Sequence, residues 1–476
     1  MRITDSTGNR YVINIKGLEE ISAKSVNPYS TIVIGGHPGA GKTILSTTIC
    51  RDNMDLGHKC LYISLQEEKS RFFRVLEGIG LELEQYEKMG LFRFVKLPIT
   101  LDIEGFMDAL NSLILNYSPN IIVIDSITPA IESVNGDAAK RAIIQNFLYN
   151  ISQLIHGLVI LLAELPIGEE ELHLGNIEFI ADVLLLLKYK LERGLMIREL
   201  EIKKARGAPI RMAQIPFTIT ERGFRTFYIT PPQDIKASAK KTYNFSIPFL
   251  KEYFGFITGP ENILITCNPD SRSAFSILVI LDLLVTNDLK GLIVTYRYSP
   301  DEGRDLIKAV LEYIGLNPTE AEELIDKHMR IVSVNPSDRS MDELFAHETM
   351  LIEKTRPDLV MFHGVEIFNS IIDQQTYFRW LLNQVFSLKE KGLIVARYMN
   401  FTDEAFYRKN ASFADLIVRG LFTRECGAER FESPDRCFYL FMRGKKPVHI
   451  PEPVALSQEN IRDLREAMVK SLYQHA

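Results

Sequence analysis

The sequence predicts a two-domain α/β protein in which each domain is a mainly parallel, twisted sheet flanked by helices. Three observations carry this prediction. Short apolar runs of strand length alternate with segments of helical periodicity over residues 31–230. The first run leads into a glycine-rich loop that opens a helix. A similar succession of runs returns roughly 230 to 240 residues later, which indicates an internal duplication.

Five apolar runs are predicted to be buried strands because they are short, largely aliphatic and bounded by polar residues. In chain order they cover residues 31–34, 59–65, 121–124, 158–163 and 182–187, and a further strand is expected at 198–202. One helix opens near Ile44, and the spacing of Phe72, Phe73, Leu76 and Ile79 predicts a second. Alternation of this kind is typical of a doubly wound sheet that binds ligands at the carboxyl edge of its strands.

Composition excludes several classes of protein. The chain has 476 residues, enough for two or three domains, with 46% hydrophobic and 24% charged residues, as in ordinary globular proteins. A net charge of −6 gives no general attraction to nucleic acids or membranes. Five scattered cysteines without a CxxC pair predict reduced, buried thiols. Since no signal peptide or membrane-spanning run is apparent, we expect a cytoplasmic protein.

The loop after the first strand has the pattern GxxxxGK[ST] of a phosphate-binding loop. It consists of Gly36, His37, Pro38, Gly39, Ala40, Gly41, Lys42 and Thr43, and Ile44 follows in the helix. Glycines let backbone N–H groups turn toward an anion, and the helix N-terminus adds positive potential. We expect Lys42 to neutralise the β- and γ-phosphates of a nucleotide and the Thr43 hydroxyl to bind Mg²⁺.

A carboxylate at the end of another strand would complete this site. Asp125 follows the apolar run 121–124, as does the acidic residue that holds the Mg²⁺ hydration shell in nucleotide hydrolases. The pattern is common by itself but becomes specific when a phosphate loop lies about 80 residues upstream. We expect Asp125 and the loop to lie at the carboxyl ends of adjacent parallel strands.

The first half of the chain resembles the KaiC-like branch of the RecA-type ATPases. The resemblance rests on the lead-in Gly17–Ile21, the phosphate loop, the acidic cluster after residues 63–65, and residues 124–126. Segments 179–182, 204–207 and 215–220 match as well, so that nearly all of residues 11–230 is covered. The resemblance implies a RecA-like P-loop fold, ATP and Mg²⁺ as cofactors, and ATPase activity. Tandem copies of the domain are also common in this family.

The resemblance assigns catalytic roles as well. In this family, glutamates after the second strand polarise the attacking water, and the matching positions here are Gln66 and Glu67, followed by Glu68. Glu67 is the preferred base, Glu68 the alternative, and Gln66 can orient water but cannot take its proton. Lys204 and Arg206 match a basic finger that reaches the γ-phosphate bound by the neighbouring subunit. This implies a ring-shaped homo-oligomer, expected to be a hexamer.

The second half repeats the pattern without its chemistry. Residues 310–316 echo residues 75–81, Asp415 echoes Asp182, and Arg443 echoes Arg206. The phosphate loop is replaced: Cys267, Asp270 and Arg272 stand at glycine positions, and Ser273 stands at the lysine position. His363 takes the place of Asp125, Arg297 and Tyr298 replace Gln66 and Glu67, and Phe441 replaces Lys204. We therefore predict a non-catalytic second domain.

These features give the following organisation. Residues 1–230 are predicted to form the ATPase domain, 231–241 a linker and 242–456 the degenerate domain. Residues 457–476 are predicted to form an amphipathic helix that packs on the degenerate domain, with docking of a partner as the alternative. The clock-type members of the family phosphorylate an adjacent Ser-Thr pair, which here reads Ala411-Ser412, so autokinase activity is not expected. The second domain is predicted to be a regulatory platform for an unknown protein partner.

Two other functions stay open. A DNA-recombination accessory ATPase would need a basic, aromatic channel, whereas residues 132–141 offer only Lys140 and Arg141, so nucleic acid is not indicated as a partner. The second alternative is a nucleotide-sensing regulator that hydrolyses ATP very slowly. It is suggested by Gln66, which stands where the family has a glutamate.

Overall fold

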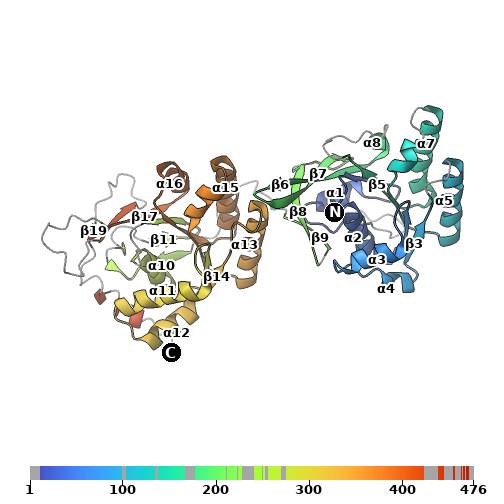
Figure 1. Cartoon of the computed structure of the whole chain (residues 1–476). Coiled ribbons are helices and arrows are strands. Elements are labelled where there is room, and N and C mark those ends of the chain that lie inside the picture. Colours follow the sequence, from blue (N-terminus) through green and yellow to red (C-terminus); the bar gives the residue numbers. More distant parts are fainter. Residues whose placement is uncertain are drawn as a thin grey trace. The chain divides into compact units, whose positions relative to one another are not determined.

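A computed structural model describes residues 11–98, 103–133, 138–166, 177–210, 212–221, 223–227, 241–248, 250–251, 256–267, 269, 275–422, 438–443, 454–455, 462–463, 465–466 and 468–470 (Figure 1). The chain divides into two compact units, Met1–Thr230 and Pro231–Ala476. No helix in the described ranges is both long and apolar enough to cross a membrane.

The first unit is built on a nine-stranded sheet with the strand order β3-β2-β4-β5-β1-β6-β7-β8-β9. The strands are β1 (Thr31–Gly36), β2 (Cys60–Ser64), β3 (Phe92–Lys96), β4 (Ile121–Asp125), β5 (Leu158–Glu164), β6 (Val183–Glu192), β7 (Leu195–Ala205), β8 (Gln214–Thr220) and β9 (Gly223–Thr226). Pairing is parallel from β3 to β6 and antiparallel from β6 to β9. The mainly parallel α/β fold expected from the sequence is therefore confirmed.

Helices cover both faces of this sheet because its strands carry apolar side chains on both sides (Figure 1). The helices are α1 (Glu19–Ser25), α2 (Lys42–Met54), α3 (Lys69–Glu77), α4 (Glu84–Lys88), α5 (Ile103–Tyr117), α6 (Thr128–Glu132), α7 (Ala138–Leu154) and α8 (Ile177–Ile180). On β1, Ile32 and Ile34 pack in the core beneath α2 and α3, whereas Val33 packs in the core beneath α5 and α7. The strand thus positions the phosphate loop between two buried layers.

Two expectations about the sheet are corrected by the structure. β5 lies between β1 and β4, so the phosphate loop and Asp125 do not follow adjacent strands. The order of strands in a sheet depends on long-range pairing that the succession of apolar runs does not contain. The sequence also did not predict β3, and the antiparallel hairpin of β6 and β7 is longer than the runs at 182–187 and 198–202.

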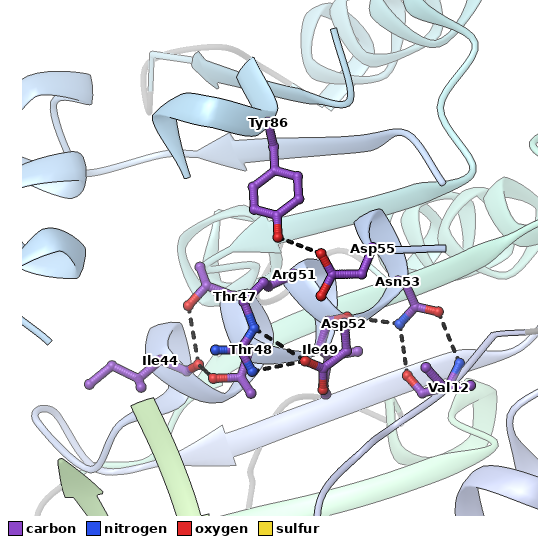
Figure 2. A network of polar contacts seen from close by, with 10 residues as sticks. All are labelled: Val12, Ile44, Thr47, Thr48, Ile49, Arg51, Asp52, Asn53, Asp55 and Tyr86. Carbon is purple, nitrogen blue, oxygen red and sulfur yellow. Dashed lines mark hydrogen bonds and ion pairs between the residues drawn. The ribbon is translucent and has the colours of Figure 1, made fainter. Parts of the chain in front are cut away.

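A side-chain clamp fixes the segment before β1 to helix α2, and Figure 2 shows it from close by. The Oδ1 atom of Asn53 accepts a hydrogen bond from the Val12 N–H at 2.9 Å, and Nδ2 donates to the Val12 carbonyl at 2.7 Å. Nδ2 also donates to the Ile49 carbonyl at 2.8 Å. The second unit repeats this clamp: Asn287 bonds both main-chain groups of Asn244 and the carbonyl of Leu283.

We expect Asn53→Ala to lower the free energy of unfolding of the first unit by about 2–3 kcal/mol, because Asn53 is completely buried and its side chain makes three hydrogen bonds to main-chain groups of Val12 and Ile49. Asn287→Ala should cost only about 1 kcal/mol in the second unit, because Asn287 is half-buried and water can replace its contacts. Hydrogen–deuterium exchange at increasing urea concentration would measure the free energy of unfolding of each unit separately. Equal losses at the two positions would contradict this role of burial.

The second unit contains an eight-stranded sheet with the order β14-β13-β15-β16-β12-β17-β18-β19. Its strands are β12 (Asn262–Cys267), β13 (Gly291–Thr295), β14 (Met329–Ser333), β15 (Leu359–His363), β16 (Ile394–Asn400), β17 (Leu416–Phe422), β18 (Phe438–Arg443) and β19 (Val454–Ala455), and a separate hairpin joins β10 (Thr242–Asn244) and β11 (Phe256–Thr258). Read in chain order, this succession matches the order from β3 to β8 of the first unit. The internal duplication therefore extends to sheet topology.

The helices of the second unit follow the same plan. They are α10 (Phe275–Thr286), α11 (Pro300–Tyr313), α12 (Pro318–His328), α13 (Met341–Thr355), α14 (Phe368–Ile371), α15 (Gln374–Glu390) and α16 (Glu404–Ala411), with a 3₁₀ turn at Val365–Ile367. Met468 of the expected C-terminal helix is buried in the core of this unit. Ile461, Leu464 and Leu472 of that helix, and residues 231–240 of the expected linker, lie outside the described residues.

Within the described ranges, Cys50, Cys60 and Cys267 are buried and form no disulfide. The Sγ atoms of Cys50 and Cys60 lie 2.9 Å apart, between α2 and β2. Cys426 and Cys437 lie outside the described residues.

A buried polar network lies at the centre of the second unit. The Glu348 carboxylate accepts hydrogen bonds from the Tyr296 hydroxyl and from Nε2 of Gln384, and Oε1 of Gln384 accepts one from Arg397 at 2.7 Å. Glu348 is completely buried, and burial raises its pKa from an ordinary value of 4.5 to about 8. Hydrogen bonds from Tyr296 and Gln384 act in the opposite direction without offsetting this effect.

We expect the stability of the second unit to fall as pH rises from about 4.5 to about 8 and then to level off. Within this range the unfolded chain binds fewer protons at Glu348 than the folded chain, so raising the pH favours unfolding by about 2–5 kcal/mol in total. Urea unfolding at several pH values would measure the slope. Glu348→Gln should remove most of it, whereas the exposed-site control Glu353→Gln should retain it; an unchanged slope in Glu348→Gln would contradict the prediction.

Candidate functional site

The loop Gly36–Thr43 joins the buried strand β1 to helix α2. Gly39 and Gly41 have φ angles of +76° and +108°. A residue with a Cβ atom would be strained in this backbone conformation. A Cβ atom on Gly41 would lie 2.9 Å from Cδ1 of Ile219, and one on Gly36 would lie 2.5 Å from the Leu187 carbonyl oxygen. Strands β6 and β8 thus press against the loop where only glycine fits. No side chain caps the N-terminus of α2, so its first N–H groups remain available to a ligand.

Lys42 folds back over this loop. Its Nζ donates hydrogen bonds to the carbonyl oxygens of Gly36 at 2.8 Å and His37 at 3.2 Å. Burial lowers the pKa of Lys42, and the nearby carboxylates of Glu164 and Asp125 oppose that shift. The two carboxylates favour the charged form of the ammonium group, and its partial removal from water strengthens its attraction for an anion.

Thr43 and Asp125 meet although β5 separates their strands. The Thr43 hydroxyl donates to Oδ2 of Asp125 at 2.9 Å, and the hydroxyl of Tyr62 donates to the same oxygen at 2.6 Å. Burial raises the pKa of Asp125, whereas hydrogen bonds from Tyr62 and Thr43 and the charge of Lys42 lower it. Hydroxyl and carboxylate oxygens are the ligands that Mg²⁺ prefers, so the donor set of Thr43 and Asp125 fits this cation.

The acidic cluster after β2 is divided between two environments. Glu67 is half-buried, and its Oε1 lies 3.5 Å from Nε of Arg71. Burial and the charge of Asp125 raise the pKa of Glu67, and Arg71 opposes them. Glu68 is exposed and forms an ion pair with Lys96 on β3, and Gln66 is also exposed. Glu67 is thus the carboxylate of the cluster that interacts electrostatically with Asp125.

Lys204 and Arg206 lie at and just beyond the end of β7. Arg206 is exposed, and its Nη1 lies 3.0 Å from Oδ1 of Asp182. Asp182 also accepts a hydrogen bond from the Thr31 N–H at 3.0 Å, at the start of β1. Nζ of Lys204 lies 3.4 Å from the Phe179 carbonyl oxygen.

Comparison with known proteins identifies this arrangement. The family model described as the KaiC ATPase matches residues 12–230, which contain the whole site. The first unit is a KaiC-like ATPase domain of the RecA superfamily. Among curated proteins, the circadian clock oscillator protein KaiC of Thermostichus vulcanus is 26% identical over 225 residues, covering 47% of this chain and 43% of that protein. KaiC of Prochlorococcus marinus (strain MIT 9313) is 25% identical over 225 residues, covering 47% and 45%. The chain thus spans less than half of the length of these relatives.

The second unit preserves the framework of the KaiC-like domain at the matching positions. Thr295 pairs with His363 as Ser64 pairs with Asp125. Asp415 accepts from the first N–H of β12 at 2.8 Å, as Asp182 does from that of β1. The sequence correspondence between His363 of the second half and Asp125 of the first therefore agrees with the strand register in the two units.

The chemistry at those positions differs from that of the KaiC-like domain. His363 stacks on Tyr398 with ring centroids 4.7 Å apart and lies 5.4 Å from Tyr298. Burial, with a smaller effect of the Arg297 charge, lowers the pKa of His363 to about 4, so it is neutral near pH 7. Arg297 pairs with Glu366 at 3.5 Å. Asp270, Arg272 and Ser273 lie outside the described residues, as does the side chain of Phe441.

Sequence reasoning missed two contributors to the site. Ile219 on β8 packs closely against Gly41, and the sequence around the loop contains no pattern that predicts this contact. Tyr62 could have been found: it lies two residues before Ser64, which pairs with Asp125, so both side chains project from the same face of neighbouring strands. A tyrosine in an otherwise aliphatic buried strand needs a partner for its hydroxyl, which was the available signal.

Proposed function

We propose that the first unit binds ATP with Mg²⁺ and hydrolyses it, as the catalytic part of a KaiC-like regulatory ATPase. The observation that carries this proposal is the convergence of Lys42, Thr43, Asp125 and Glu67 at one edge of the sheet, with Thr43 and Asp125 in direct contact. A glycine loop alone would support only phosphate binding. The added carboxylates supply the groups that metal binding and water activation require.

Each residue has a chemical task in this proposal. Backbone N–H groups of the loop and the Lys42 ammonium bind phosphate oxygens, while Thr43 and Asp125 hold Mg²⁺. Bound Mg²⁺ would neutralise charge that develops on the phosphates. Glu67 accepts a proton from the attacking water, and its raised pKa makes it a better acceptor than an ordinary glutamate. Exposure and the ion pair with Lys96 favour a surface role for Glu68.

The second unit serves, in this proposal, as a non-catalytic platform for a protein partner. The neutral, stacked His363 cannot replace the charge of Asp125, and Tyr298 places no carboxylate at the position of Glu67. The retained sheet order and the retained clamp at Asn287 support a folded domain that acts through its shape and not through catalysis. Autokinase activity is not part of the proposal, because Ala411 lacks a hydroxyl and the local nucleotide site is altered.

The proposal includes assembly of several copies of the chain into a ring, in which Arg206 of one copy acts at the nucleotide site of the next. Arg206 is exposed and held by Asp182 outside its own site, which suits a finger that serves a neighbouring copy. We expect Arg206→Ala to lower ATP turnover by at least about 100-fold with little change in ATP affinity, because an arginine finger stabilises the transition state. Arg225→Ala, at an exposed position on β9, is the matched control.

The decisive experiment measures phosphate release against protein concentration, together with particle mass by light scattering. Mg²⁺-dependent turnover that rises with concentration and disappears in Arg206→Ala would support hydrolysis at a site completed by a neighbour. Turnover by a monomer that is indifferent to Arg206 would reject the ring, and binding without turnover would reject the hydrolase.

A further inference from the structure

The carboxylate of Asp125 receives a second, unexpected hydrogen bond. Tyr62 and Thr43 both donate to Oδ2, at 2.6 and 2.9 Å, one from the middle of β2 and the other from the first turn of α2. Thr43 has a competing task in the proposed function, because its hydroxyl oxygen would also bind the cation. Tyr62 has no such task, so its bond is the one that can hold Asp125 whether or not a cation is bound.

Packing fixes the Tyr62 ring in the orientation that this bond requires. Its centroid lies 4.6 Å from that of Phe72 on α3 and 6.0 Å from that of Phe94 on β3, with the Phe94 ring nearly parallel. Tyr62 is completely buried, so its hydroxyl has no access to bulk water as an alternative partner. The Ser46 side chain also hydrogen-bonds Tyr62, and the surrounding rings leave the Tyr62 hydroxyl little freedom to turn away from Asp125.

The second unit provides an internal comparison. Since Ser64 pairs with Asp125 as Thr295 pairs with His363, the residue that corresponds to Tyr62 is Ile293. Ile293 is buried but has no hydroxyl. The donor and the carboxylate are therefore both absent from the unit that is proposed to lack catalysis, and both present in the unit proposed to have it.

We propose that Tyr62 is a positioning residue that orients the Asp125 carboxylate for a divalent cation. The inference rests on the proposed function, in which Asp125 and Thr43 hold Mg²⁺. By fixing Oδ2 from the β2 side, Tyr62 keeps the carboxylate beside Thr43 and reduces the rearrangement needed when the cation arrives.

The test uses full-length protein and a fluorescent N-methylanthraniloyl derivative of ATP, titrated with Mg²⁺. We expect Tyr62→Phe to leave nucleotide binding in EDTA nearly unchanged, to lower the melting temperature by several degrees while the protein stays folded, and to raise the Mg²⁺ concentration for half-saturation by about 10-fold, as for loss of one hydrogen bond to a charged group. Tyr86→Phe is the matched control: its hydroxyl donates to Oδ1 of Asp55 at 2.5 Å, away from the loop, as Figure 2 shows. It should not alter the Mg²⁺ dependence.

A double-mutant cycle separates this inference from the function on which it rests. Asp125→Asn should raise the Mg²⁺ requirement more than Tyr62→Phe does, and the double variant should add little, because Tyr62 acts through Asp125. A shift in Asp125→Asn without one in Tyr62→Phe would overturn the role of Tyr62 alone. No shift in Asp125→Asn would overturn the metal site and with it the role of Tyr62. Equal weakening of binding with and without Mg²⁺, or additive effects, would show that Tyr62 only supports the fold.

Discussion

Lys42→Ala is expected to weaken ATP binding by about 10–100-fold, because charge-assisted hydrogen bonds to the phosphates are lost. Hydrolysis should fall by about 1,000-fold or more, since the lysine also stabilises charge that develops in the transition state. The loop would lose the two internal contacts from Nζ to Gly36 and His37 as well. Isothermal titration calorimetry and phosphate release would measure the two effects separately.

Lys24→Ala is the matched control for this experiment. Lys24 is an exposed lysine of the same unit that pairs with Glu20 on α1, so its loss should change neither binding nor turnover. If Lys42→Ala bound ATP as tightly as the parent protein, the loop would not be the phosphate site. A melting temperature equal to that of the parent protein would show that the lost binding does not come from unfolding.

Glu67→Gln is expected to lower the hydrolysis rate by about 100- to 10,000-fold while leaving ATP affinity almost unchanged. Glutamine has nearly the shape of glutamate but cannot accept a proton from water. Single-turnover measurements with saturating ATP would isolate this step. Because burial and the charge of Asp125 raise the pKa of Glu67, turnover of the parent protein should fall as pH decreases through that raised pKa and the base becomes protonated.

Glu68→Gln separates the two candidate bases. Glu68 is exposed and paired with Lys96, so its substitution should leave turnover within about 2-fold of the parent rate. The opposite result, a large loss in Glu68→Gln and none in Glu67→Gln, would assign the base to Glu68. Gln66→Glu tests the sensor alternative: a marked increase in turnover would mean that Gln66 keeps the parent enzyme slow.

The fold was largely predictable because its central strands are short apolar runs buried on both faces. β1, β4 and β5 begin and end close to the runs read from the sequence. β3 was missed because it is an edge strand with exposed Arg93 and weaker patterning. The prediction that β1 and β4 are adjacent was wrong, because strand order depends on pairing between segments that are distant in sequence.

The candidate site divides in the same physical way. Residues within one motif, such as Lys42 and Thr43, are fixed by local backbone geometry and were read directly from their spacing. Contacts between motifs depend on register and packing, and the bonds of Tyr62 and the pressure of Ile219 on Gly41 belong to this class. The choice of Glu67 over Glu68 used family resemblance, and the different burial of the two carboxylates now adds a physical reason.

The close approach of Ile219 to Gly41 also bears on how the site forms during synthesis. The phosphate loop leaves the ribosome early, but the strand that presses on it is among the last elements of the first unit to be made. Translation must therefore pass β8 before the loop can acquire its final shape, because domains generally fold as units. A nascent chain that stalls before β8 would carry the whole GxxxxGK[ST] motif and still lack a finished nucleotide site.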